Sequence, residues 1–175
     1  GDACDGGEKK LSTPKKKKKE EKEKEEESAF ATMAMAFKMA TTGMRVTEEC
    51  SSSFMEMKWK KVHRYIVFKI EEKSRIITVD KVGGAGESYH DLAASLPVDD
   101  CRYAVFDFDF VTVDNCRKSK IFFIYWSPEA SRIRAKILYA TSKAGLRRKL
   151  EGIHYELQAT DPTEMAFDII QDRAK

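Results

Sequence analysis

The sequence predicts an α/β (α+β) protein with a central mixed sheet of five or six strands and helices on both faces. The hydropathy pattern gives the element order helix, hairpin, helix, hairpin, long helix, strand, helix. In addition, the run IFFIYW at 121–126 is apolar at every position. A strand of this kind is covered on both faces, which places it inside a sheet that has helices on either side.

The folded region is predicted to begin near Val46 with a helix. Thr47 is a suitable cap, and Glu48 and Glu49 favour the positive end of the helix dipole. Apolar residues then recur at spacings of four, four and three and mark one buried face: Val46, Cys50, Phe54 and Met57.

A hairpin is expected next, with strands at 63–70 and 75–82 and a polar turn at 71–74. We interpret Gly83, Gly84 and Gly86 as a flexible loop. A phosphate-binding loop is not favoured, because GGAGES lacks the GK[ST] ending. Ser88 to Leu96 is predicted to be a short helix that Pro97 ends.

The segment 101–113 is predicted to be a strand with strict alternation. The aromatic face carries Phe106, Phe108 and Phe110, and the other face carries Asp107 and Asp109. Aromatics at this period can stack on RNA bases, but the aspartates would repel phosphate, so core packing is the favoured interpretation. The two aspartates share a face without further ligands, and no metal site is predicted.

The rest of the chain is predicted as a turn, a strand, a long helix, a strand and a helix. The turn spans 114–119, the doubly covered strand is 121–126, and Ser127-Pro128-Glu129 marks the start of the helix. A break near Thr141–Ser142 and Gly145 is expected to divide that helix. The last strand is 155–159, and Thr160-Asp161-Pro162 begins a helix through Gln171.

The long helix has an unusual charge pattern. Seven basic residues and no acidic one lie between Ser131 and Leu150. On a helical wheel, one apolar stripe contains Ala135, Leu138 and Tyr139, and an opposite stripe contains Ala130, Ile133 and Ile137. The second stripe, flanked by Arg134 and Lys136, is either a docking ridge for an acidic partner with an apolar cleft or a second buried face with solvated cations around it.

Composition limits the possible functions. The 175 residues carry a net charge of +3, and residues 1–32 contribute nine lysines and nine acids. The remaining 23 basic and 20 acidic groups give a mildly basic domain that favours acidic protein, anionic lipid or nucleic acid as a partner. Four scattered cysteines and three scattered histidines form no zinc or catalytic pattern, so we expect an intracellular protein with reduced thiols, no cofactor and no enzymatic activity.

We expect three parts along the chain. Residues 1–32 form a disordered or frayed helical charged extension, for which Met33 is a candidate natural start. Residues 33–45 form a flexible segment, and 46–173 form the folded domain. The run from Pro14 to Lys19 resembles a short nuclear-import signal.

Several segments together resemble one family, the actin-depolymerizing factor/cofilin proteins, and especially its plant members. The resemblance spans about residues 40–173. The segments that carry it are Gly43-Met44, YIVFKI at 65–70, CRYAVFDFDF at 101–110, KSKIFF at 118–123, WSP at 126–128, RAK at 134–136, YATSK at 139–143 and ELQATD at 156–161.

The resemblance implies the cofilin-like fold and a protein that binds actin monomers and filaments, prefers the ADP form, and severs or depolymerises filaments. Contacts with monomer and filament are implied for Gly43, Met44, Arg45, Arg134, Lys136 and Ile137. Filament-only contacts are implied for Arg117, Lys118, Lys120, Glu164 and Asp168.

Regulation, partners and location follow from the same resemblance. Thr42 occupies the place of the family's inhibitory phosphoserine, where a phosphate would add negative charge to the actin contact. Phosphoinositides are expected to compete for the basic surface. We expect a monomer in the cytoplasm at the actin cytoskeleton, with the nucleus as a second location, and no specific nucleic-acid ligand. Filament stabilisation or bundling is the alternative activity, because a second cationic patch could bridge filaments.

Overall fold

The computed structural model describes residues 13–41 and 44–175, with the side chains of 36–41 excepted. Six strands form one mixed sheet in the order β1-β3-β2-β4-β5-β6. The strands are β1 (Arg45–Val46), β2 (His63–Glu71), β3 (Ile76–Gly84), β4 (Arg102–Val111), β5 (Arg117–Trp126) and β6 (Tyr155–Ala159). The helices are α1 (Pro14–Thr41), α2 (Glu48–Trp59), α3 (Tyr89–Ser95), α4 (Ile133–Lys149), η1 (Pro162–Met165) and α5 (Phe167–Ala174).

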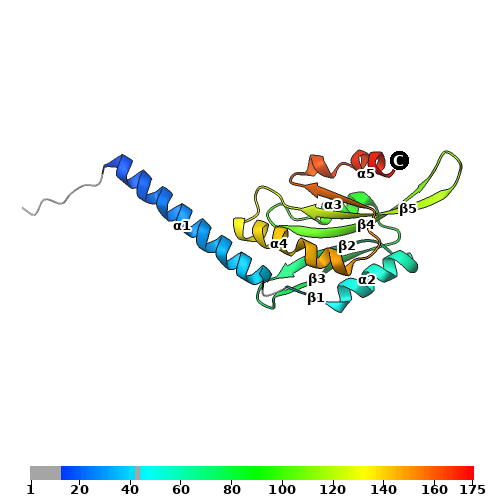
Figure 1. Cartoon of the computed structure of the whole chain (residues 1–175). Coiled ribbons are helices and arrows are strands. Elements are labelled where there is room, and N and C mark those ends of the chain that lie inside the picture. The colour runs from blue at the N-terminus through cyan, green and yellow to red at the C-terminus, as the bar shows by residue number, and fades with distance from the viewer. Residues whose placement is uncertain (1–12, 42–43) are drawn as a thin grey trace, which may run out of the picture.

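Helices cover the sheet on both faces, as the sequence predicts (Figure 1). On one face, α2 and α4 bury Phe54, Met57 and Tyr139 against the strands. On the other, α3 and α5 bury Leu92 and Ile170. The strand 121–126 is buried throughout and lies between β4 and β6, so its doubly covered position is confirmed.

The sheet is mixed because its edge strands pair in parallel and its central strands in antiparallel fashion. β1 is parallel to β3, and β6 is parallel to β5. The two predicted hairpins, β2–β3 and β4–β5, are both present. The aromatic face of β4 packs in the core, since Phe106 and Phe108 are buried and Phe110 packs against them.

The prediction of a glycine loop after the first hairpin was wrong for Gly83 and Gly84, which are the last residues of β3, whereas Gly86 lies in the turn that follows. A side chain at Gly83 would collide with Tyr65, whose ring lies 2.2 Å from the position of an added Cβ. Glycine here allows close packing of an aromatic ring against a strand.

The predicted start and division of the long helix were also wrong. Residues 127–132 form a turn in which the Ser131 N–H donates to the Pro128 carbonyl (3.0 Å), and the helix begins only at Ile133. A serine and a proline favour a tight turn as well as a helix start. The helix then continues through Gly145, and the Thr141 hydroxyl donates to the Ile137 carbonyl (2.8 Å) inside it.

Two other boundaries differ from the prediction. β5 begins at Arg117, so the predicted turn at 114–119 is shorter and the two cations at 117 and 118 lie on a strand. The last helix is interrupted at Ala166, whose backbone is extended (φ −62°, ψ 138°), which leaves η1 and α5 as separate helices.

The charged N-terminal part is helical over the residues that the structure describes. α1 runs without interruption from Pro14 to Thr41, across the boundary predicted between residues 32 and 33. Lysine and glutamate are good helix formers, and i,i+4 pairs such as Lys19–Glu23 (3.8 Å) support the helix. It projects from the domain and contacts it along α4 (Figure 1).

Candidate functional site

The outer face of α4 is the first candidate surface. Ile133, the first residue of the helix, is 59% exposed, whereas Ala135, Leu138 and Tyr139 on the opposite side are buried. Ile137 is half-buried and packs beside Leu138. We call Ile133, Arg134, Lys136 and Ile137 the α4 ridge. Of its two apolar side chains, that of Ile133 points outward and that of Ile137 is only partly exposed.

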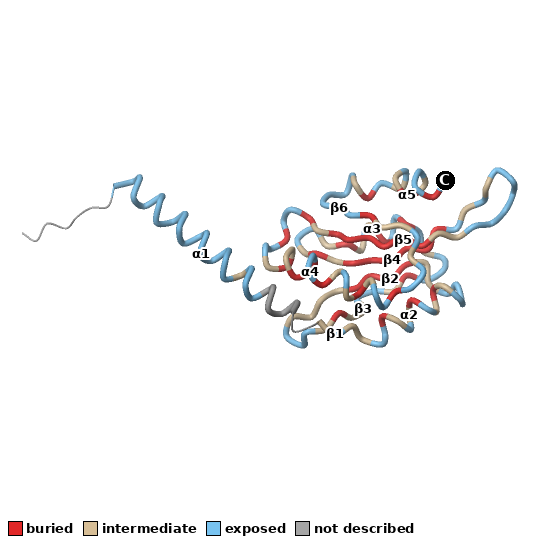
Figure 2. The backbone as a smooth tube through the Cα atoms, viewed as in Figure 1, coloured by how far each residue is buried: buried red, intermediate tan, exposed pale blue. Residues whose placement is uncertain are grey.

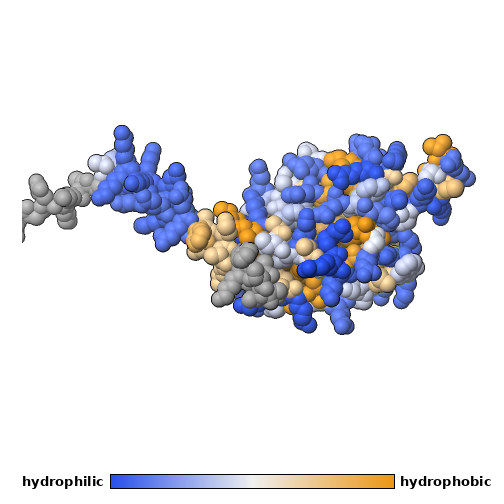
Figure 3. Space-filling model, viewed as in Figure 1, coloured by the Kyte–Doolittle hydropathy of each residue, from blue (hydrophilic) through white to orange (hydrophobic). Residues whose placement is uncertain are grey.

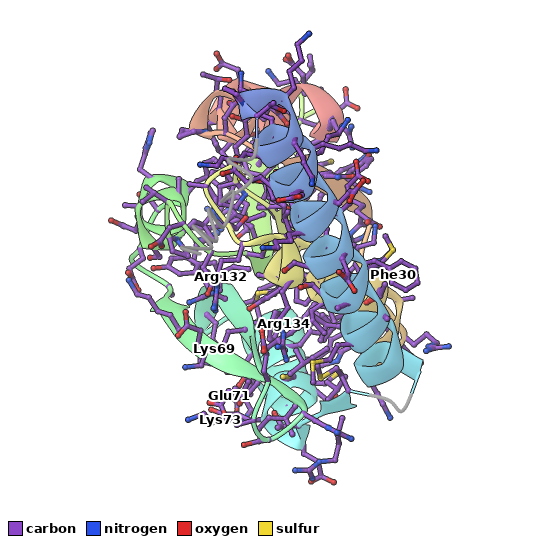
Figure 4. The ribbon with its side chains drawn as sticks, turned by 90° about the vertical axis from the view of Figure 1, so that its left-hand side faces the viewer. Phe30, Lys69, Glu71, Lys73, Arg132 and Arg134 are labelled. Carbon is purple, nitrogen blue, oxygen red and sulfur yellow. The ribbon has the colours of Figure 1, made fainter. Side chains whose placement is uncertain are left out.

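The two cations of the α4 ridge contact oxygen atoms of this chain. Arg134 Nε lies 3.0 Å from Glu72 Oε2, and Lys136 Nζ donates to the Glu129 carbonyl at 3.0 Å. Figure 4 shows Arg132 and Arg134 near Glu71, the last residue of β2, and Lys73 in the turn that follows. The ridge therefore presents cations in fixed orientations.

Tyrosines fix α4 to the sheet beneath the ridge. The Tyr139 hydroxyl accepts a hydrogen bond from the Ile70 N–H at 2.9 Å, and Tyr103 donates to the Tyr139 carbonyl. Burial raises the pKa of Tyr139 to about 12, so this hydroxyl is neutral at physiological pH. The ridge rests on a rigid support.

The segment before α2 lies beside the α4 ridge. Met44 is half-buried and packs in the same small cluster as Ile137 and Leu138. Arg45 is exposed on β1, and its N–H donates to the Arg75 carbonyl at 3.0 Å. Thr42 and Gly43 lie outside the described residues. Met44 and the ridge are therefore brought together as one surface.

Helix α1 passes over one end of this surface. A hollow between α1 and α4 is lined by Ile133 together with Lys24, Glu25, Ser28, Ala29 and Thr32. α1 is hydrophilic along most of its length and apolar where it approaches the domain (Figure 3). Phe30 is 72% exposed and does not line this hollow.

The second candidate surface is the end of the β4–β5 hairpin. β2 pairs with β4 only up to Phe106, and β6 pairs with β5 only from Phe122. Residues 107–121 therefore project as a two-stranded extension with an exposed tip (Figure 2), which we call the hairpin arm. Arg117 and Lys118 are exposed on it, and Lys120 is half-buried at its base.

The base of the hairpin arm carries several lysines near His154. The pKa of His154 is lowered, first by burial and then by the charges of Lys120 and Lys58. His154 Nδ1 accepts a hydrogen bond from the Ile121 N–H at 2.9 Å, which requires the neutral ring. Cations from α2 and β5 therefore gather at this end of the sheet.

The acidic residues predicted on the last helix have different surroundings. Glu164 lies within η1, which Asp161 caps, and accepts a hydrogen bond from the Thr160 hydroxyl at 2.8 Å, whereas Asp168 is exposed on α5. The ring of Phe167 contacts that of Phe108 with centroids 5.5 Å apart. This contact brings Asp168 close to the base of the hairpin arm.

Sequence reasoning missed the side chains that support the two surfaces. Glu72 pairs with Arg134, and Lys61 pairs with Asp107 at 2.8 Å, although 46 residues separate the latter two. Nothing in the local sequence pattern marks such tertiary pairs. Among the described residues, no cluster of side chains could bind a metal ion, and no helix has the length and hydropathy to cross a bilayer.

Comparison with known proteins adds to this geometry. Residues 43–175 match the family model described as cofilin/tropomyosin-type actin-binding protein. The chain is 92% identical over 143 residues to actin-depolymerizing factor 5 of Arabidopsis thaliana, a match that covers 82% of this chain and 100% of that protein. It is 79% identical over 141 residues to actin-depolymerizing factor 9 of the same species, covering 81% and 100%. The crystal structure of Streptomyces griseoflavus cofilin matches with a TM-score of 0.70 and 32% identity over 76% of this chain and 98% of that one.

Proposed function

The chain belongs to the family of cofilin/tropomyosin-type actin-binding proteins, and on this premise we propose that it binds actin monomers and filaments and depolymerises or severs the filaments. The family consists of non-enzymatic actin-binding proteins. The observation that carries the proposal is the α4 ridge, where an isoleucine that is 59% exposed is followed at once by Arg134, with Lys136 two residues further on.

The α4 ridge and the segment beside it form the contact common to monomer and filament. An exposed Ile133 supplies apolar area for a cleft, and the two oriented cations supply charge-assisted hydrogen bonds to acidic groups around that cleft. Gly43, Met44 and Arg45 extend this contact from the neighbouring chain segment. A phosphate on Thr42 would add negative charge there and weaken binding.

The hairpin arm forms the additional contact that only a filament offers. Arg117, Lys118 and Lys120 lie on the arm, and Asp168 on α5 lies near its base. Glu164 on η1 is proposed to add a further contact with the filament. Since α4 begins at the end of the domain away from the arm (Figure 1), the two surfaces suit two neighbouring subunits of one filament.

The main test replaces the two ridge cations. We expect Arg134→Ala with Lys136→Ala to abolish co-sedimentation with filaments and monomer binding, because loss of desolvated charge contacts costs about 2–5 kcal/mol, more than about 30-fold in affinity. Arg148→Ala with Lys149→Ala is the matched control, since it removes two exposed cations from the C-terminal end of the same helix. Equal binding by the two variants would contradict the role of the ridge.

Filament bundling is the second candidate activity, favoured by the presence of two cationic surfaces at separate ends of one domain. If each surface binds a different filament, the protein links filaments together. Low-speed sedimentation distinguishes the activities, because bundles pellet and severed filaments stay in the supernatant. Imaging of single filaments with the 33–175 fragment would report severing directly.

The remaining parts of the proposal concern partners and domain roles. We expect the domain 46–173 to act as a monomer in the cytoplasm and the nucleus, and residues 1–32 to be dispensable for actin binding. Anionic phosphoinositides are expected to compete with actin for the basic surfaces. Vesicles that contain phosphatidylinositol 4,5-bisphosphate should therefore release the protein from actin, whereas neutral vesicles should not.

A further inference from the structure

The hairpin arm lacks the support that the rest of the sheet has. From Asp107 to Val111 on β4 and from Arg117 to Ile121 on β5, the two strands pair only with each other. Two-stranded hairpins are marginally stable in water without a third strand or a packed face. Whatever fixes the base of the arm therefore determines where Arg117 and Lys118 are presented.

One face of the arm is fixed by aromatic packing. The rings of Phe108 and Phe110 stack with centroids 5.3 Å apart, and Phe108 also contacts Phe167 of α5. Alternation along a strand leaves the opposite face to Asp107 and Asp109. That second face is polar, so packing alone cannot hold it.

A partly exposed ionic cluster around the buried Asp107 holds the polar face. Asp107 is 2% exposed, and its Oδ2 atom lies 2.8 Å from Lys61 Nζ. Its Oδ1 atom accepts a hydrogen bond from the Ser119 hydroxyl on β5, and Lys61 Nζ also donates to that hydroxyl oxygen at 2.8 Å. Three side chains from β4, β5 and the end of α2 are thus joined at the point where pairing with β2 ends.

The backbone of Lys61 provides an independent sign that its side chain matters. Lys61 follows the cap of α2 and has φ +56°, a left-handed conformation for which glycine is the usual residue. A lysine in this conformation carries a strain of about 1–3 kcal/mol that the surrounding structure has to compensate. The contacts with Asp107 and Ser119 give that compensation.

We propose that Asp107, clamped by Lys61 and Ser119, is a positioning residue that orients the hairpin arm for filament binding. The carboxylate of Asp107 is buried and therefore does not contact a partner. Asp107 acts by holding β5, which carries Arg117 and Lys118, in position. The inference takes one premise from the proposed function, namely that the hairpin arm binds filaments. The rigidity of the arm can be measured without actin.

Asp107→Asn is the variant that tests the inference, and Asp109→Asn is its matched control. Both remove one negative charge from the same face of β4, but Asp109 is half-exposed, pairs mainly with Arg64 at 3.1 Å and lies at the longer distance of 3.9 Å from Lys61 Nζ. If only the net charge mattered, both variants would bind an acidic filament more tightly, and by the same amount. Only Asp107→Asn breaks the short contact with Lys61 at 2.8 Å and changes the acceptor of the Ser119 hydroxyl.

We expect Asp107→Asn to weaken filament binding about tenfold, within the range that coupled neighbouring residues show, and to leave monomer binding within about twofold. Asp109→Asn should not weaken filament binding. Combined with Lys118→Ala and Lys120→Ala, Asp107→Asn should add little further loss, because the contacts that it positions are already absent. Equal effects of the two asparagine variants, or equal losses of monomer and filament binding by Asp107→Asn, would overturn the inference.

Hydrogen exchange on the protein alone separates this inference from the proposed function. Amides of the arm should exchange faster in Asp107→Asn than in Asp109→Asn, while those of α4 stay unchanged. If exchange rises as expected but Lys118→Ala with Lys120→Ala binds filaments normally, the proposed filament surface fails and the clamp stands. If exchange does not rise, the proposal that Asp107 positions the arm is wrong. If Asp107→Asn does not fold, Ser119→Ala is the second variant. It removes one hydrogen-bonding side chain of the cluster but keeps the pair between Lys61 and Asp107. We expect the same faster exchange and weaker filament binding, with smaller changes.

Discussion

The α4 ridge and the hairpin arm are both basic, yet they are built in opposite ways. The ridge is part of a helix whose inner face is buried in the core, and its two cations contact Glu72 and the Glu129 carbonyl. The arm is two strands without a third, and in the part of the chain that the structure describes no acid pairs with Arg117 or Lys118. The ridge is a rigid, partly apolar surface, whereas the arm offers exposed charge on a support that needs its own clamp.

This difference indicates what each surface contributes to binding. A preorganised apolar ridge gives affinity by burying area without ordering costs. Exposed cations contribute to encounter rate and specificity, and salt screens their effect. The two surfaces should therefore respond differently to apolar substitution, to ionic strength and to changes in their intramolecular partners.

The largest effect is expected from a charge placed at the apolar tip of the ridge. Ile133→Asp would bring a carboxylate into an acidic, desolvated contact, which should cost several kcal/mol, or about a hundredfold or more in affinity for both monomer and filament. The fold should be unaffected, because Ile133 is 59% exposed. Titration of labelled actin monomers and co-sedimentation measure the two affinities.

Val113→Asp provides the control for this experiment. Val113 is a fully exposed apolar residue at the tip of the hairpin arm, so the same chemical change is made on the other surface. Monomer binding should be unchanged in Val113→Asp. A similar loss in both variants would mean that the ridge has no special role in the monomer contact.

Part of this contrast could be predicted from the sequence. The 3.6-residue period separated Leu138 and Tyr139, which are buried, from Ile133, which is exposed. The continuous apolar run at 121–126 placed β5 inside the sheet. These features depend on local periodicity, which a sequence displays directly.

The rest could not be predicted because it depends on contacts between distant segments. Lys61 looks like one lysine among several after α2, and only the fold brings it to Asp107. Ser127 and Pro128 fit a helix start and a turn equally well, and the choice was made by packing: the Ser131 side chain is buried and donates to the Pro128 carbonyl. Gly83 is glycine because of a ring on the neighbouring strand.

A smaller effect is expected from removing cations of the arm. Lys118→Ala with Lys120→Ala should leave monomer binding unchanged and weaken filament binding by roughly 2- to 30-fold, since exposed ion pairs are worth about 0.2–1 kcal/mol each. The loss should shrink as ionic strength rises from about 0.05 to about 0.3 M, because the screening length falls below about 10 Å. Co-sedimentation over a salt series measures it, with Arg148→Ala and Lys149→Ala as the charge-matched variant. A loss that does not depend on salt would show that the arm binds through packing, as the ridge does.

The smallest effect concerns the intramolecular partner of the ridge. Glu72 and Arg134 form a half-exposed pair at 3.0 Å, and an acidic partner has to compete with Glu72 for this arginine. We expect Glu72→Gln to tighten binding of monomer and filament by up to about fivefold, because the pair is worth at most about 1 kcal/mol and the glutamine keeps the shape of the side chain. Glu71→Gln makes the same charge change one residue away, where the carboxylate lies 3.9 Å from Lys69, and should have less effect. If Glu72→Gln weakens binding instead, Glu72 orients Arg134 for its partner. The ridge would then depend on an ionic clamp as the hairpin arm does, and the contrast between the two surfaces would be one of degree.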